Sequence, residues 1–380
     1  MTLTLALGVL PFCGTALEDS ATPGPDSAVP DSAVPDTGDS GPTDTANPPA
    51  DTGTGPTDQL RTFVVVHLEA TWTGDGGDVL TGSRAYDPTA PAASTYVETF
   101  WPTLQALVAS ADAHAVALNL FFNPQWGLYI QDSARCSPTA PHASCLAEVH
   151  AWEASGHALG LHHHGMFHGS WNGFTNRTSW PENYVGQDCN GDGDEGDPAD
   201  TCTPTTDPFY LGDVADMMAL LEPLSASGAL VASTLGPESV PAPLGGDAER
   251  AVFTDWPGPE MTSHAAGIHM PDDLISSPVC QTYGDVTGRS FDVGELTMGL
   301  FSSADEHLAE LEAARAKADP ATQAMGIVFH VEQYHPDEAW ENNHDDIDAL
   351  FAWFEHSGSQ AMTVADVIGG FEGEGSFRCP

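Results

Sequence analysis

Short runs of β-branched apolar residues alternate along this chain with segments whose apolar residues recur at helical spacing. Residues 64–69 and 327–332 are continuous apolar runs of the kind found in strands buried on both faces. The same patterns predict helices over 94–113, 146–155, 214–224, 304–318 and 345–356, and further strands over 115–122, 158–161 and 229–234. Repeated strand–helix alternation predicts a parallel α/β fold, and at this length a barrel is its natural closure.

Both β-branched runs end in His-x-Glu. Alternation along a strand places His67 and Glu69 on one face, and likewise His330 and Glu332. If both strands belong to one barrel, their carboxyl ends open onto the same rim, where such folds keep their chemistry. Either pair could instead only satisfy neighbouring backbone groups. Because the motif occurs at both ends of the folded region, a functional role is favoured.

Residues 162–168 carry four closely spaced histidines, namely His162, His163, His164 and His168. Neutral imidazole is a common zinc ligand, and His164 and His168 have the separation that puts two side chains on one face of a helical turn. The alternative is a loop that has collected polar residues. Together with the two His-x-Glu strand ends, the cluster predicts a metal site.

The first part of the chain differs from the rest. Residues 1–17 contain a short apolar run followed by Cys13, which resembles a bacterial lipoprotein signal with Cys13 as the acylated residue; an ordinary secretion signal is the alternative. Residues 18–58 are rich in Pro, Asp, Thr and Ser and predict a disordered acidic linker. Residues 59–380 then form the folded domain, which is expected to be exported, as a surface lipoprotein or a secreted protein, and monomeric.

The net charge limits the partners that the protein can bind, and the cysteines predict its disulfides. The chain has 9 Lys and Arg against 55 Asp and Glu, a formal net charge of -46. Nucleic acid and anionic membranes are therefore poor partners, apart from a lipid anchor at Cys13. With Cys13 set aside, six cysteines remain, and loop length favours the pairs Cys136–Cys145, Cys189–Cys202 and Cys280–Cys379.

An insertion over residues 169–208 lacks apolar periodicity. Its centre resembles the calcium loops of EF-hand and dockerin-type repeats, with oxygen side chains at alternate positions and Gly193 in the sixth place. The candidate calcium ligands are Asp188, Asn190, Asp192, Asp194 and Asp197. A disordered acidic loop closed by Cys189 and Cys202 is the alternative.

The run from Gly156 to His162, followed by His-x-x-x-His and by a late strand ending in His330, resembles the polysaccharide deacetylase (NodB-homology) carbohydrate esterases. The resemblance implies a distorted (β/α)7 barrel and a metal-dependent hydrolase that removes acetyl groups from a polysaccharide, with zinc as the expected metal. It places the metal histidines on His164 and His168, with His162 competing for the role, the carboxylate ligand on Glu69, and the general acid on His330.

In that family an aspartate serves as the general base, and Leu68 occupies its place here. Glu332, His67 or Asp255 must then replace it, and Glu332 is preferred because its strand should lie beside the first one. Trp72, Trp126, Trp171 and Trp340 are candidates for stacking on sugar rings. A catalytically inactive barrel that binds glycan or calcium at the cell surface, or a metallohydrolase of another specificity, are the competing interpretations.

Overall fold

The computed structural model describes twelve stretches of the chain, residues 59–69, 96–163, 173–174, 203–206, 210–226, 230, 232–235, 260–264, 274–283, 286–293, 304–336 and 344–379. The chain divides into two units, Met1–Gly53 and Thr54–Pro380, and every described residue belongs to the second. The predicted signal segment with Cys13 and the linker lie outside the described residues, as does the calcium loop. Among the described helices, none is both long enough and apolar enough to cross a membrane.

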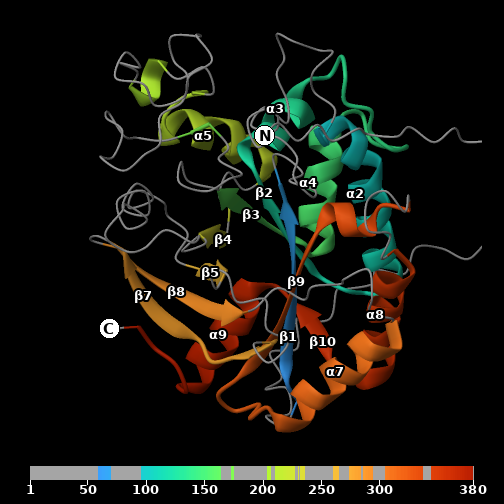
Figure 1. The fold of residues 1–380 in the computed structure, drawn as a ribbon, viewed down its shortest axis with the longest axis vertical. Helices are drawn as coiled ribbons and strands as arrows, with labels where there is room; N and C mark the ends of the chain where they lie inside the picture. The colour runs from blue at the N-terminus through green and yellow to red at the C-terminus, as the bar shows by residue number, and fades with distance from the viewer. Residues whose placement is uncertain are drawn as a thin grey trace, which may run out of the picture. The chain divides into compact units, whose positions relative to one another are not determined.

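Ten strands of the described residues form one mixed, mostly parallel sheet (Figure 1). In sheet order they are β6 (Ile275–Ser276), β9 (Ala324–His330), β1 (Arg61–Leu68), β2 (Leu118–Phe122), β3 (Ala158–His163), β4 (Ala232–Leu235), β5 (Glu260–His264), β8 (Val286–Val293) and β7 (Val279–Tyr283), while β10 (Gln360–Met362) pairs with β1. The β6–β9 and β7–β8 pairs are antiparallel, and the other pairs are parallel. The predicted α/β class is confirmed.

The predicted strand–helix alternation holds in part: helices follow β1, β2, β3, β8, β9 and β10, whereas the described residues from β4 to β8 contain no α-helix. The helices are α2 (Tyr96–Ala113), α3 (Pro124–Gln131), α4 (Cys145–Ser155), α5 (Val214–Leu221), α7 (Ala304–Lys317), α8 (His344–Ser357) and α9 (Val364–Glu374), with 3-10 turns η1 (Pro204–Thr206), η2 (Glu222–Leu224) and η6 (Val331–Tyr334). Helix α3 was not predicted. It begins directly after β2, where the Asn123 side chain accepts a hydrogen bond from the Gln125 amide and Pro124 occupies the first helical position.

The central strand β1 is buried on both faces, which explains its continuous apolar sequence. Val64, Val66 and Leu68 belong to a large core cluster that includes residues of α2, α3, α4, α5, α7 and α8. Phe63 and Val65 point the other way, into a second cluster that contains Phe291 of β8 and the apolar side of α9. Since side chains alternate along a strand, His67 shares the face of Phe63 and Val65. The first histidine of the site therefore lies on the α9 side of the sheet.

A buried amide fastens α9 to the sheet. The Asn119 side chain donates from Nδ2 to the carbonyl oxygen of Val64 at 2.9 Å and accepts at Oδ1 from the Val364 amide at 2.9 Å. Asn119 is fully buried. Because a buried amide is costly unless it is hydrogen-bonded, this residue sets where α9 begins relative to β1 and β2.

Two of the three predicted disulfides are present in the described residues, Cys136–Cys145 and Cys280–Cys379. Cys189 and Cys202 lie outside them. Disulfides persist in oxidising compartments, so the two bridges indicate an extracytoplasmic protein.

The predicted insertion is described only near its ends. The Leu211 amide donates to the carbonyl oxygen of Gly173 at 2.8 Å, and Phe174 forms an isolated parallel bridge with Gly212. Phe174 is buried in the large core cluster. Gly173 and Leu211, 38 positions apart in the sequence, therefore lie side by side.

The expected strand through Glu332 ends earlier than predicted. Strand β9 stops at His330, and η6 begins at Val331. The His330 amide donates to Gln333 Oε1 at 2.8 Å, which closes the turn. Strand alternation therefore does not place Glu332, and the argument that put it on the face of His330 was wrong. Its position is set by the turn instead.

Candidate metal centre

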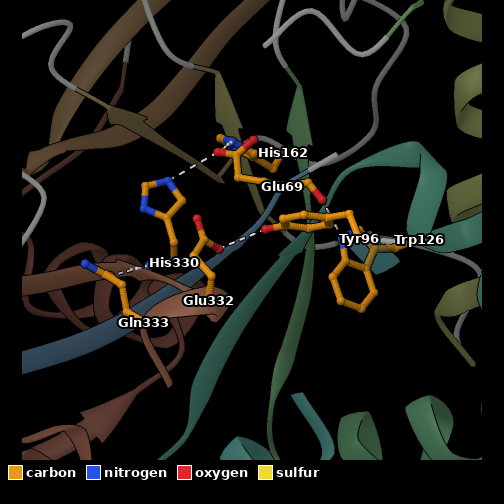
Figure 2. A network of polar contacts seen from close by, with 7 residues as sticks. All are labelled: Glu69, Tyr96, Trp126, His162, His330, Glu332 and Gln333. Carbon is orange, nitrogen blue, oxygen red and sulfur yellow. Dashed lines mark hydrogen bonds and ion pairs between the residues drawn. The ribbon is translucent and has the colours of Figure 1, made fainter. Parts of the chain in front are cut away.

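The parallel strands β9, β1 and β3 bring polar side chains to one edge of the sheet. His67 and His330 are direct register partners on β1 and β9, Glu69 follows β1, and His162 lies near the end of β3. Parallel strands share the direction of their carboxyl ends, so residues distant in sequence meet there (Figure 2). The predicted convergence of Glu69, His162 and His330 is thus present.

Glu69 is the centre of this cluster. Its Oε1 lies 2.8 Å from Nε2 of His162 and 3.2 Å from Nε2 of His330. Glu69 and His162 are buried, and the side chain of His330 is 19% exposed. Two imidazoles from different strands therefore approach the same carboxylate oxygen, and of the two only His330 is partly exposed to solvent.

His67 lies against both of the other imidazoles. Its ring stacks on His162 with the ring centroids 4.1 Å apart and the planes 21° apart, and it meets His330 edge-on at 5.2 Å. His67 is only 1% exposed. Three imidazoles and one carboxylate thus share a small, largely dehydrated space.

His67, Glu69 and His330 form a group that suits a metal ion. One ligand atom from each lies within 4.8 Å of the others. Bonds from zinc to imidazole nitrogen or carboxylate oxygen are about 2.0–2.2 Å long, so donors this close reach one ion with small side-chain rotations. Two imidazoles and a carboxylate are also a donor set that zinc accepts in catalytic sites. The residues present therefore fit a divalent ion.

Glu332 approaches this group from η6 and is held by a tyrosine. The Tyr96 hydroxyl, at the start of α2, donates to Glu332 Oε2 at 2.8 Å. Burial raises the pKa of Glu332 to about 7; His330 lowers it and Glu69 raises it, both by smaller amounts. Burial, and then the charges of Glu332 and Glu69, raise the pKa of Tyr96 well above its usual range. The tyrosine therefore remains a hydrogen-bond donor at neutral pH.

A second aromatic donor supports the Glu69 segment. Trp126 of α3 donates from Nε1 to the backbone carbonyl oxygen of Glu69 at 2.7 Å. The indole is fully buried in the large core cluster. The prediction that Trp126 stacks on a sugar ring was wrong, because no face of its ring is open to a ligand. The other three candidates, Trp72, Trp171 and Trp340, lie outside the described residues.

Five of the predicted site residues come together at this edge of the sheet, His67, Glu69, His162, His330 and Glu332. The remaining candidates lie outside the described residues, namely His164, His168, Asp255 and the calcium-loop residues Asp188, Asn190, Asp192, Asp194 and Asp197. Tyr96 and Trp126 were missed as site residues. Neither has a sequence signal for this role, because an aromatic residue near a helix start usually belongs to the core.

Comparisons of the chain with protein-family models, with curated proteins and with solved structures found no match.

Proposed function

We propose that this protein is a metal-dependent hydrolase that removes acyl groups, acetyl foremost, from a polysaccharide outside the cytoplasm. The observation that carries the proposal is the group of His67, Glu69 and His330, whose ligand atoms lie within 4.8 Å of one another at the carboxyl ends of parallel strands. The resemblance of the histidine-rich segment to polysaccharide deacetylases supplies the reaction class. Zinc suits the donor set best.

We further propose that the sheet closes into the distorted (β/α)7 barrel that this resemblance implies. The seven parallel strands run in the order β9-β1-β2-β3-β4-β5-β8. The segment over residues 275–283 supports closure, since it pairs with β9 at Ile275 and with β8 at Val279. The contact between Phe63 of β1 and Phe291 of β8, with ring centroids 5.0 Å apart, also supports it. A closed sheet would place the metal group at its rim.

In this proposal His67, Glu69 and His330 hold the ion, and His162 orients Glu69 through its 2.8 Å contact. A divalent ion bound there supplies Lewis-acid chemistry, lowering the pKa of a water molecule and polarising the acyl carbonyl. His330 then acts as a ligand, in place of the general-acid role that the resemblance gave it. His164 and His168 remain candidate ligands outside the described residues.

Glu332 takes the role of proton carrier. Its carboxylate receives a proton from the attacking water as the water oxygen bonds to the acyl carbon. It returns that proton to the leaving oxygen or nitrogen as the C–O or C–N bond breaks. The products are acetate and a free hydroxyl or amino group on the sugar. This role rests on the place of Glu332 beside the metal group, where Tyr96 holds one of its carboxylate oxygens (Figure 2).

Metal analysis and acetate release test the proposal together. The purified protein is expected to contain about one zinc per chain and to release acetate from acetylated xylan, chitooligosaccharide or peptidoglycan. A chelator should abolish the release, and added zinc should restore it. Folded protein that contains no transition metal and releases no acetate would contradict the proposal.

One observation favours a second function, a catalytically inactive barrel that binds glycan or calcium at the cell surface. Leu68 occupies the place of the family's catalytic aspartate, and its side chain is fully buried in the large core cluster. A barrel without that base would retain the metal and the fold. Zinc binding without acetate release from any of the three substrates would support this second function.

A further inference from the structure

Tyr96 links the first described helix, α2, to the proposed proton carrier Glu332. We propose that Tyr96 is a positioning residue that fixes the carboxylate of Glu332 beside the metal group. The inference rests on the proposed function and deepens it, because it names a residue that acts on the reaction without touching the substrate.

The contact joins two segments that are far apart in the chain. Tyr96 and Glu332 are 236 residues apart in sequence, and the hydroxyl donates to Oε2 at 2.8 Å in a buried environment. Figure 2 shows the carboxyl group of Glu332 with one oxygen directed at the Tyr96 hydroxyl and the imidazole of His330 on its other side. The hydroxyl thus engages one carboxylate oxygen and leaves the second oxygen on the side of the metal group.

The tyrosine ring itself is held firmly. It packs against Phe100 one turn further along α2, with ring centroids 4.6 Å apart, and meets Trp126 edge-on at 6.5 Å. Trp126 in turn holds the backbone of Glu69. Through their packed rings, Tyr96 and Trp126 therefore connect the carboxylate of Glu332 with the backbone of Glu69.

The backbone of Glu332 is already fixed by η6, whose first turn is closed by the bond from the His330 amide to Gln333. Its side chain still has three rotatable bonds, and the Tyr96 hydroxyl selects one arrangement of them. A misplacement of about 1 Å at a reacting group can cost about 100-fold in rate. Loss of the hydroxyl should therefore slow the reaction without emptying the metal site.

The test compares Tyr96→Phe with a matched control. Tyr334→Phe also removes a buried tyrosine hydroxyl that donates to a carboxylate at 2.8 Å, but its partner is Asp348 on α8. On an acetylated glycan that the wild-type protein hydrolyses, Y96F should lower kcat about 10- to 100-fold. KM and zinc content should stay within about twofold of wild type, and Y334F should retain wild-type kcat.

A double-variant cycle separates positioning from a general structural effect. If Tyr96 acts through Glu332, Y96F should have little further effect on kcat in the Glu332→Gln background. Wild-type kcat for Y96F, or an equal loss in both backgrounds, would overturn the inference. Wild-type protein without acetate release would instead defeat the proposed function.

If Y96F is too unstable to assay, Glu332→Asp tests the same contact by changing the acceptor in place of the donor. Aspartate keeps the charge but is one methylene too short to reach the hydroxyl from the same backbone. E332D should then lower kcat about 10- to 100-fold with zinc content unchanged, and wild-type kcat for E332D would overturn the inference.

Discussion

The imidazole of His162 and the carboxylate of Glu69 meet at 2.8 Å, although the two residues are 93 positions apart in the sequence. The same Glu69 oxygen lies 3.2 Å from His330. Glu69 thus serves as the common point of three strands, and its orientation depends on a histidine outside the proposed metal group. Partners of this kind fix the geometry of a metal ligand and tune its basicity.

Replacing His162 by Gln should weaken zinc binding about 10- to 100-fold, the usual cost of losing an outer partner of a metal ligand. Chelator competition on the purified variant measures the affinity. His150→Gln is the control. His150 lies on α4, and its Nε2 contacts the carbonyl oxygen of Pro223 on η2, so the substitution changes a partly buried histidine contact outside the metal group. Complete loss of zinc from H162Q would show instead that His162 is itself a ligand.

Replacing Glu69 by Gln should have a larger effect than the His162 variant, because it removes the charge of the carboxylate ligand while preserving its size. We expect zinc affinity to fall by more than about 100-fold and acetate release to disappear. Glu153→Gln is a suitable control, since Glu153 accepts hydrogen bonds from Ser225 and Ala226. Zinc content that is the same in E69Q and the wild type would exclude Glu69 as a ligand.

His157 should make the stability of the protein depend on pH. Its Nδ1 accepts from the Leu118 amide at 3.0 Å, and its Nε2 lies 3.2 Å from Asp112. Burial lowers the pKa of His157, and the opposing effect of Asp112 is smaller. Below about pH 6.5 the unfolded chain therefore binds more protons than the folded one, and the free energy of unfolding falls as the pH falls.

Urea unfolding of the wild type and His157→Gln at pH 7.5, 6.5 and 5.5 measures this contribution. The stability advantage of the wild type should be largest at about pH 7.5 and should shrink toward about pH 5.5, by no more than about 1.4 kcal/mol per pH unit. An advantage that grows on acidification would show that His157 is charged in the folded state.

Phe291 should contribute strongly to stability, because it fills the core cluster between β1 and α9. It is fully buried, and its ring centroid lies 5.0 Å from that of Phe63 and 6.4 Å from that of Phe371. Phe291→Ala should cost roughly 3–5 kcal/mol in the free energy of unfolding. Phe377, which is only partly buried against the same cluster, provides the control. Equal losses for F291A and F377A would show that β8 does not pack tightly on β1.

The parallel α/β class could be predicted because the two faces of β1 both meet hydrocarbon, so its sequence reads as an uninterrupted apolar run. Helix α3 escaped prediction because it is short, although Asn123 and Pro124 form a recognisable helix start. Strands β5 and β8 escaped because polar residues interrupt them, as in Glu260–His264. Their pairing is a tertiary property that local pattern does not contain.

At the site, the meeting of Glu69 with His330 followed from two strands that carry the same motif. The turn at Val331 was not predicted. Glu332 does lie near His330, but the turn places it there and strand alternation does not. Tyr96 could not be found at all, because a contact between residues 236 positions apart depends on how α2 packs against η6. Sequence pattern identifies donors on strands better than it identifies the helical residues that orient them.

The bridge between Phe174 and Gly212 has an evolutionary consequence. A stretch of chain whose two ends meet at one point can be lengthened, shortened or exchanged without displacing the strands on either side. Here that stretch begins shortly after the strand that carries His162. Changes in the length of that stretch are therefore expected to leave the pairing of β3 with its neighbouring strands, and with it the place of His162, unaltered.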